Sequence, residues 1–201
     1  MINAGGIQSG VAQTIAGKCV KGNQAFLGVY NESMVEDLLS FYAQGKEATE
    51  HFDLFFKKHK FSGLALADHV CYKCGSSEEF DEVRAILEKG AAYVYQTIIS
   101  SRRIAYIKLT APLPTGLGGV WFIELSDQKP DGSQRSGFDH IEIYPAGEGS
   151  YELLLATLKK NDEQVVHVER PHHVTDEVTL PSGLVVRLEP GPLIEKIKQE
   201  L

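Results

Sequence analysis

Two histidines and two glutamates recur at matching positions in two stretches of the sequence. Each histidine, His69 or His140, follows an aspartate, and a glutamate, Glu124 or Glu189, comes 55 or 49 residues later. Neutral imidazole suits zinc, iron, cobalt and nickel, and carboxylate widens the choice to manganese and magnesium. The pattern predicts one divalent metal ion (zinc, nickel, iron or manganese) with these four side chains as its ligands.

Such a site implies a particular chemistry. Four protein ligands leave open positions on an octahedral ion, where substrate oxygens bind and the ion acts as a Lewis acid. Taken singly, a buried histidine is more often a hydrogen-bonded core residue, and a glutamate near a strand end is usually solvated. The occurrence of all four at repeat-related places is what favours the metal site.

The N-terminal part of the chain differs from the rest. Residues 1–30 show no period and are predicted to form an irregular leader. Residues 31–62 have helical spacing, which predicts two helices that are interrupted at Gly45 and pack on the domain. Asn31 or Ser33 is the expected cap of the first helix, and the phenylalanines of the second, Phe52 among them, are expected in the core.

The remaining sequence repeats one order of elements. In residues 63–130 a strand at 64–74, a helix closed by Gly90, and strands at 91–100, 103–110 and 120–125 are predicted. Residues 137–191 give the same order, with a strand at 138–144, a helix at 150–160 and three short strands at 165–169, 177–180 and 184–188. A C-terminal helix is predicted at 192–201.

This order predicts the fold class. It is α+β, with two tandem βαβββ modules that form a half-open barrel around a central cavity, and with an N-terminal helical extension. A cupped sheet of four strands needs its twin to complete the cavity. Because the first and last strands of such a unit can lie side by side, each module brings one histidine and one glutamate to the concave face.

Strand alternation predicts which other side chains line the cavity. Glu142, which shares the face of His140, is a candidate general base. Three cations are candidates for binding a substrate carboxylate or phosphate, although they could equally balance the nearby acidic groups: Lys73, Arg103 and Arg187. Tyr144 and Phe122 complete the predicted lining, and alternation places Asp68 and Asp139 on the outer face.

These motifs resemble those of a known superfamily. The paired modules with His69, Glu124, His140 and Glu189 on first and last strands are similar to vicinal oxygen chelate proteins, which include glyoxalase I, extradiol dioxygenases and fosfomycin-resistance proteins. Within that superfamily the chain most resembles the YecM-like group, over residues 48–201. The resemblance implies one metal on those four residues. It leaves the fourth ligand open, because YecM-like chains have histidine where Glu189 stands.

The composition limits the classes of molecule that the protein is expected to bind. The net charge of −7 disfavours nucleic acid and anionic membranes as partners, and three cysteines argue for a reducing compartment. No apolar stretch reaches the ~20 residues that a membrane span needs. We therefore expect a cytoplasmic protein, a monomer or homodimer, that acts on a small molecule.

Three functions compete at this point. The first is a metal-dependent isomerase, lyase or dioxygenase acting on a small oxygenated or anionic substrate. The second is a metal-free protein of the same fold that binds a small molecule. The third is an interaction module that uses the phenylalanine-rich N-terminal helices as a docking face. The presence of all four ligand-type residues favours the first.

Overall fold

The computed structural model describes residues 35–170, 174–192 and 194 of the chain, and within them eight strands form one mixed sheet. The predicted leader, the expected caps Asn31 and Ser33, and nearly all of the predicted C-terminal helix lie outside the described residues. The elements are α1 (Leu38–His59), β1 (Ala65–Lys73), α2 (Ser77–Glu88), β2 (Ala91–Ile99), β3 (Arg102–Thr115), β4 (Gly118–Ser126), β5 (Gly137–Pro145), α3 (Ser150–Lys160), β6 (Val166–Glu169), β7 (Val174–Thr179) and β8 (Val185–Leu188).

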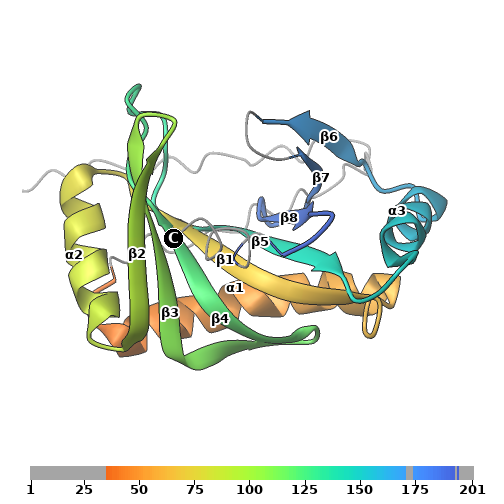
Figure 1. Ribbon diagram of the computed structural model, residues 1–201, viewed down its shortest axis with the longest axis horizontal. Coiled ribbons are helices and arrows are strands. Elements are labelled where there is room, and N and C mark those ends of the chain that lie inside the picture. The colour runs from red at the N-terminus through yellow and green to blue at the C-terminus, as the bar shows by residue number, and fades with distance from the viewer. Residues whose placement is uncertain (1–34, 171–173, 193, 195–201) are drawn as a thin grey trace, which may run out of the picture.

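The sheet is built from the two predicted modules. Its strand order is β2-β3-β4-β1-β5-β8-β7-β6, so β1 and β5 meet at the centre and each module extends outward from them (Figure 1). Within each module the first strand pairs in parallel with the last, β1 with β4 and β5 with β8, while β1 and β5 run antiparallel. The α+β class and the repeated βαβββ order are thus confirmed.

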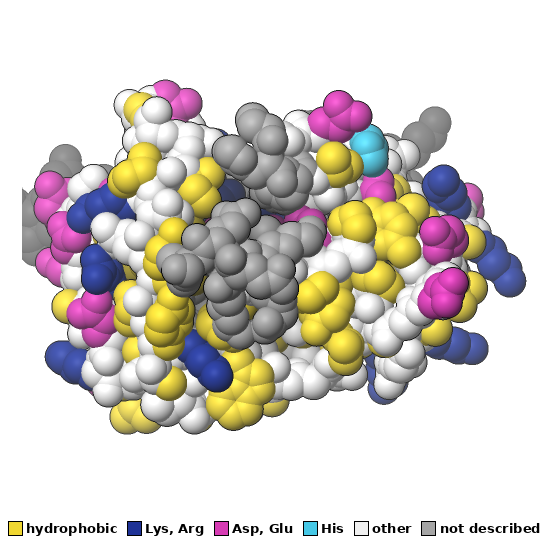
Figure 2. All heavy atoms as spheres, viewed as in Figure 1, with side chains coloured by type: hydrophobic (Ala, Val, Ile, Leu, Met, Phe, Trp, Pro, Cys, Tyr) yellow, Lys and Arg dark blue, Asp and Glu magenta, His cyan; other side chains and the backbone are white. Residues whose placement is uncertain are grey.

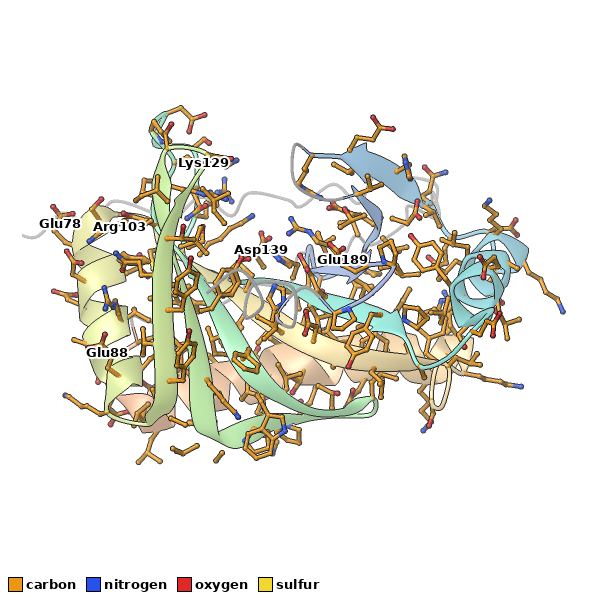
Figure 3. All side chains as sticks on the ribbon, in the orientation of Figure 1. Glu78, Glu88, Arg103, Lys129, Asp139 and Glu189 are labelled. Carbon is orange, nitrogen blue, oxygen red and sulfur yellow. The ribbon has the colours of Figure 1, made fainter. Side chains whose placement is uncertain are left out.

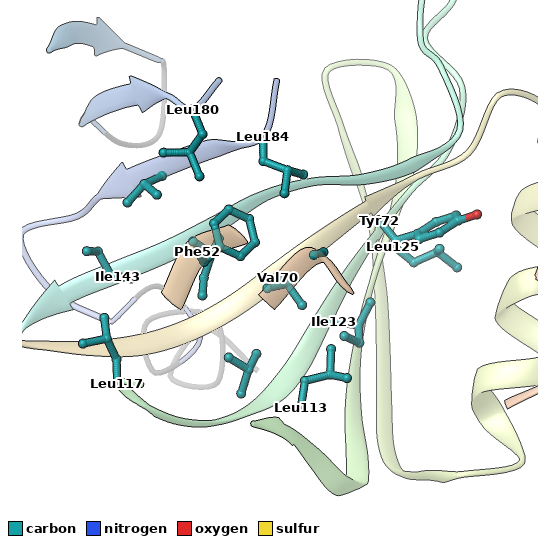
Figure 4. Close-up of a cluster of buried hydrophobic side chains, with 14 of the residues drawn as sticks. Phe52, Val70, Tyr72, Leu113, Leu117, Ile123, Leu125, Ile143, Leu180 and Leu184 are labelled. Atoms are coloured by element: carbon teal, nitrogen blue, oxygen red, sulfur yellow. The ribbon is translucent and has the colours of Figure 1, made fainter. Parts of the chain in front are cut away.

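The helices α1, α2 and α3 pack on one face of this sheet. Residues of α1, α2 and α3 share a single core with Val70, Ile123, Ile143 and other strand residues of that face. Figure 4 shows part of this core, with Phe52 of α1 among aliphatic side chains of both modules. The alternate residues of the same strands point to the opposite face, and they include the predicted histidine and glutamate ligands. None of the helices in the described part of the chain is long and apolar enough to cross a membrane.

The N-terminal region forms one helix where two were predicted. Asp37 caps α1 through a reciprocal pair of hydrogen bonds with Ser40, and the helix continues through Gly45 to His59. Glycine weakens an isolated helix, but tertiary packing compensates here. Gly45 is buried at the point where α1 crosses the β3–β4 hairpin, in contact distance of Leu113 and Phe138.

Replacing Gly45 by leucine is expected to lower the free energy of unfolding by about 1–3 kcal/mol, the usual cost of overpacking. A Cβ atom there would lie 2.9 Å from Leu113 Cδ2 and 3.1 Å from Phe138 Cζ. Urea denaturation measures the effect. Lys46→Leu, which adds the same side chain at the next, exposed position, is the control. Equal midpoints for the two variants would contradict this account of the crossing.

The β3–β4 hairpin is longer than predicted. β3 continues to Thr115, past its predicted end at residue 110 and through Pro112 and Pro114, with a break in register between Lys108 and Leu113. Two contacts to α1 hold this extension: Tyr42 Oη donates to the Ala111 carbonyl at 2.6 Å, and the Gly116 N–H donates to Asp53 Oδ1 at 2.6 Å. Tertiary contacts therefore outweigh the local turn signals here.

Candidate metal centre

Three of the four predicted ligands meet at the centre of the sheet. Donor atoms of His69, Glu124 and His140 all lie within 4.8 Å of one another. The register explains the convergence, because Cys71 of β1 pairs with Glu124 of β4 on one side and with His140 of β5 on the other. His69 is two residues away on the same face of β1, and both imidazoles are buried. Both modules thus contribute to one cluster.

Glu142 joins this cluster from β5. Its Oε2 lies 3.7 Å from His69 Nε2, and its Oε1 lies 3.6 Å from His140 Nε2. Glu142 is directly opposite His69 in the β1–β5 ladder and is only 1% exposed. With Asp68 and His69 it forms a second group of donor atoms within 4.8 Å of one another. The two carboxylate oxygens therefore face the two imidazoles.

Glu189, the fourth predicted ligand, belongs to neither group of donor atoms. It is buried and follows β8, with its backbone N–H bonded to the Ile143 carbonyl. The register shows why it is set apart. In the first module, Glu124 pairs with Cys71, the residue two positions after His69. In the second module, Arg187 pairs with Glu142, the residue two positions after His140. Arg187, and not Glu189, thus stands at the position equivalent to Glu124.

Two β-bulges place the aspartates that precede the histidines. The β1–β5 register passes from Ala67–Ile143 to His69–Glu142 and from Cys71–His140 to Tyr72–Phe138, which leaves Asp68 and Asp139 as the extra residues. The prediction that these aspartates lie on the outer face was wrong. A bulge suspends the alternation of faces on which that prediction relied.

Each aspartate contacts the imidazole of its neighbour. Asp139 Oδ2 lies 2.8 Å from His140 Nδ1, and Asp68 Oδ2 lies 3.4 Å from His69 Nδ1. A carboxylate at Nδ1 holds the proton there and turns the Nε2 lone pair inward, as carboxylates behind metal-binding histidines do. Burial disfavours the Asp139 charge, but His140 and Lys73 outweigh burial and hold the pKa of that carboxyl below its usual value.

The centre contains buried polar atoms that no protein group satisfies. Among the described residues, His69 Nε2 and Glu142 Oε2 are shielded from solvent and have no hydrogen-bond partner. Such atoms are costly unless something binds them. Two imidazole nitrogens and two carboxylates are a donor set that suits zinc, iron, nickel or manganese. The residues present therefore fit a divalent metal ion.

The charges of the cluster are strongly coupled. Burial raises the pKa of Glu142, but the positive charges that His69 and His140 carry when protonated outweigh burial and lower that pKa to about 2. Burial likewise opposes ionisation of Glu124, whose pKa is nevertheless held well below its usual value by His69. Tyr106 Oη donates to Glu124 Oε2 at 3.1 Å and fixes the orientation of this carboxylate. Both glutamates are thus ionised acceptors directed at the same small volume.

Two of the three predicted cations are at the site. Arg187 Nη1 lies 2.7 Å from His140 Nε2 and 3.5 Å from Glu142 Oε1, and its Nε is 3.0 Å from Glu177 Oε1. Lys73 Nζ pairs with Asp139 Oδ1 at 2.6 Å and so reaches the site through that aspartate. Both side chains are partly accessible, at 16% and 21%.

Arg103 lies away from the centre, contrary to the prediction that it lines a substrate cavity. It pairs with Asp81 and Asp127 and lies over the Phe80 ring, at 4.3 Å from the centroid. Figure 3 shows it beside α2, away from Asp139 and Glu189 in the middle of the molecule. Phe80 belongs to the core on the helix side of the sheet, so Arg103 faces that side. Ile104, the residue after Arg103 in β3, packs on the opposite face.

An apolar wall flanks the charged centre on the side of the first module. Phe122, a predicted lining residue, packs there with Ile104, Tyr106 and Ile194. The Ile194 N–H donates to Asp68 Oδ2 at 3.2 Å, so the segment after β8 contacts the carboxylate behind His69. Tyr144, the other predicted lining residue, pairs with Leu66 at the far end of β5 and is partly exposed. No pattern in the sequence pointed to Tyr106 or Ile194 as residues of the site.

The comparisons with known proteins agree with this fold. The model of the YecM protein family matches residues 31–190. The chain belongs to the YecM family. A solved structure described as "Protein EC4020" superposes on this YecM-family chain with a TM-score of 0.58 at 20% identity, covering 77% of this chain and 90% of that one. The predicted resemblance to the YecM-like group, with two tandem modules, is thereby confirmed.

More distant solved structures also match this YecM-family chain. The 2,3-dioxygenase LapB from Pseudomonas sp. KL28 has a TM-score of 0.41 at 15% identity, and the match covers 65% of this chain and 42% of that one. The fosfomycin resistance protein FosX from Listeria monocytogenes, whose structure contains Mn(II), has a TM-score of 0.25 at 12% identity, with coverages of 65% and 95%. Among curated proteins, none matches the chain.

Proposed function

We propose that this protein is a divalent-metal enzyme of the vicinal oxygen chelate type, acting on a small oxygenated or anionic substrate by isomerase, lyase or dioxygenase chemistry. The observation that carries the proposal is the pair of buried, unsatisfied atoms His69 Nε2 and Glu142 Oε2 beside Glu124 and His140. We assign the four ligands as His69, Glu124, His140 and Glu142, with Glu189 as the alternative fourth ligand from the sequence.

The ligand role suits Glu142 better than the predicted role of general base. A general base has to reach the proton that it removes, whereas Glu142 is only 1% exposed and its carboxylate lies among the other candidate ligands. Its two oxygens also face both imidazoles. A carboxylate that stays ionised and bridges the two modules is a good ligand and a weak base.

The rest of the proposed mechanism belongs to the protein's own side chains. The bound ion would supply Lewis acidity to substrate oxygens. Tyr106 holds Glu124 in place, and the apolar wall with Phe122 and Ile104 excludes water from one side of the centre. Arg187 offers its guanidinium to a substrate carboxylate or phosphate.

Elemental analysis of the purified protein, followed by calorimetric titration with Zn²⁺, Ni²⁺, Mn²⁺ and Fe²⁺, tests the proposal. We expect one ion per chain. Glu142→Gln is expected to weaken binding of the preferred ion by about 100-fold, since removing a charged ligand forfeits several kcal/mol. Glu189→Gln, the same chemical change at a second buried glutamate, is expected to have less than a tenfold effect.

Two outcomes of that titration would be decisive. Absence of any bound ion from the wild type, with no thermal shift on adding the four metals, would refute the metal enzyme. A loss in Glu189→Gln that exceeds the loss in Glu142→Gln would return the fourth ligand to Glu189.

A metal-free binding protein of the same fold is the second candidate. The contact between Arg187 Nη1 and His140 Nε2 favours it, because a guanidinium can neutralise the two glutamates in place of an ion. The docking-module hypothesis loses its basis, since Phe52, Phe55 and Phe56 of α1 are buried in the core. The first two candidates differ in whether the wild type binds metal.

The proposal also includes the compartment, the kind of partner and the oligomeric state. Cys71 and Cys74 are buried free thiols, which fits the predicted reducing, cytoplasmic compartment. On the face drawn in Figure 2, basic side chains are interspersed with acidic and apolar ones, in keeping with a small-molecule partner. A monomer or homodimer meets the requirement of the site, because both modules lie on one chain.

A further inference from the structure

Arg187 stands where the repeat of the modules calls for a second carboxylate. Glu124 of β4 is opposite the residue two after His69, and Arg187 of β8 is opposite the residue two after His140. A cation thus replaces an anion at equivalent positions. The missing carboxylate comes from Glu142, which is the strand partner of Arg187. This exchange of roles within the second module needs a physical reason.

The contact of Arg187 with His140 is incompatible with metal ligation by the same atom. Arginine has no acceptor, so Nη1 donates to Nε2 of His140 across 2.7 Å. The single lone pair of Nε2 can accept this hydrogen bond or bind a metal ion, but not both. Asp139, at 2.8 Å from Nδ1, holds the other ring nitrogen as the donor. Arg187 therefore has to leave His140 whenever Nε2 serves as a ligand.

Arg187 has a second anchor that does not involve the centre. Its Nε lies 3.0 Å from Glu177 Oε1 on β7, and Glu177 is held in turn by Arg170 and Thr175. The guanidinium spreads its charge over a fixed fork of five N–H donors, so it can keep this ion pair while the Nη1 N–H is released from His140. Its side chain is 16% exposed, which gives the released group a route to solvent and substrate.

We propose that Arg187 is a metal-released anion clamp: it donates to His140 until Nε2 ligates an ion, and it then offers the freed N–H groups to a carboxylate or phosphate oxyanion bound beside that ion. The inference rests on the proposed metal centre and adds a specificity-determining residue to it. Metal binding and anion binding become coupled, so the anion is captured only at a loaded site. By the reciprocity of linked equilibria, the anion also tightens the metal.

The test compares metal affinity in the wild type, R187M and R187K by calorimetry, with Mn²⁺ and Zn²⁺ alone. R187M is expected to bind about tenfold more tightly or better, because no charged hydrogen bond has to be broken at Nε2. Arg187→Lys keeps the charge but lacks the fork, so a smaller gain is expected; it also covers the case in which R187M fails to fold. Equal affinities in all three proteins would overturn the inference.

A double-mutant cycle separates the contact from simple charge repulsion. The affinities of H140Q and of H140Q/R187M are measured under the same conditions. If Arg187 acts through His140, its removal has little effect in the H140Q background. If its positive charge merely repels the ion, the gain is the same in both backgrounds, and that result would overturn the proposal.

Inorganic phosphate is the probe for the anion arm. It is titrated into Mn²⁺-loaded wild type and Mn²⁺-loaded R187M, with both proteins saturated by the metal. The wild type is expected to bind phosphate about tenfold more tightly, and equal affinities would remove the clamp. Failure of the proposed function looks different, because neither the wild type nor R187M would then bind metal at all.

Discussion

Replacing His69 or His140 by alanine is expected to lower the affinity for the preferred divalent ion by about 100- to 1,000-fold. Structural zinc sites with four ligands have apparent binding free energies of ~10–16 kcal/mol, so each ligand supplies about 2.5–4 kcal/mol, and every 1.4 kcal/mol is tenfold. Both imidazoles are buried and both lie beside Glu142, so each substitution removes one of the two nitrogen donors at the centre. Competition with a chromogenic chelator measures affinities over this range.

His167→Ala is the matched control for these two variants. His167 also contacts an aspartate, with Nδ1 2.9 Å from Asp176 Oδ1, but it lies on β6 at the edge of the sheet and its side chain is 58% exposed. It should retain the affinity of the wild type. Wild-type affinity in His69→Ala or His140→Ala would show that the ion binds elsewhere.

The second large effect is expected from the aspartate behind His140. Asp139→Asn should weaken metal binding about 10- to 100-fold, the usual consequence of removing a carboxylate that orients a metal-binding histidine. The neutral amide no longer favours the proton on Nδ1, so some His140 rings carry it on Nε2, where it blocks ligation. Asp68→Asn is expected to cost less, because Asp68 Oδ2 lies 3.4 Å from His69 Nδ1 against 2.8 Å for Asp139 and His140.

Two measurements distinguish tautomer control from a general loss of charge. Nitrogen chemical shifts of the imidazole rings should report a mixed tautomer for His140 in Asp139→Asn before any metal is added. Asp131→Asn removes an equal charge from an exposed loop and should change neither the shifts nor the affinity. A pure Nδ1–H tautomer together with weakened binding in Asp139→Asn would contradict the orienting role.

The order of elements could be predicted from the sequence because hydrophobic period and turn residues repeat in both modules. The meeting of His69, Glu124 and His140 followed from that order, since parallel first and last strands bring their side chains together. What escaped prediction depends on single-residue register. Adjacent residues of a strand point to opposite faces of the sheet. A bulge at Asp68, or an error of one residue in the assignment of Arg103, therefore places the side chain on the face opposite to the predicted one.

The choice between Glu142 and Glu189 illustrates the same limit. Both are buried and both lie in the second module, and sequence spacing matched Glu189 to Glu124. Only the pairing of β5 with β8 shows that Arg187 takes that place and that Glu142 is opposite His69. Likewise, local sequence predicts a helix break at Gly45, whereas the close approach of Leu113 and Phe138 is what requires a glycine there.

The central pairing of β1 with β5 has a consequence for stability. Each module supplies donors to the same centre, so neither half of the chain could bind the ion alone, and an occupied site would act as a cross-link between them. At a free ion concentration of 100 times Kd, such a cross-link stabilises the folded chain by about 2.7 kcal/mol. That energy would be lost if the two halves separated at the seam, even with each half still folded.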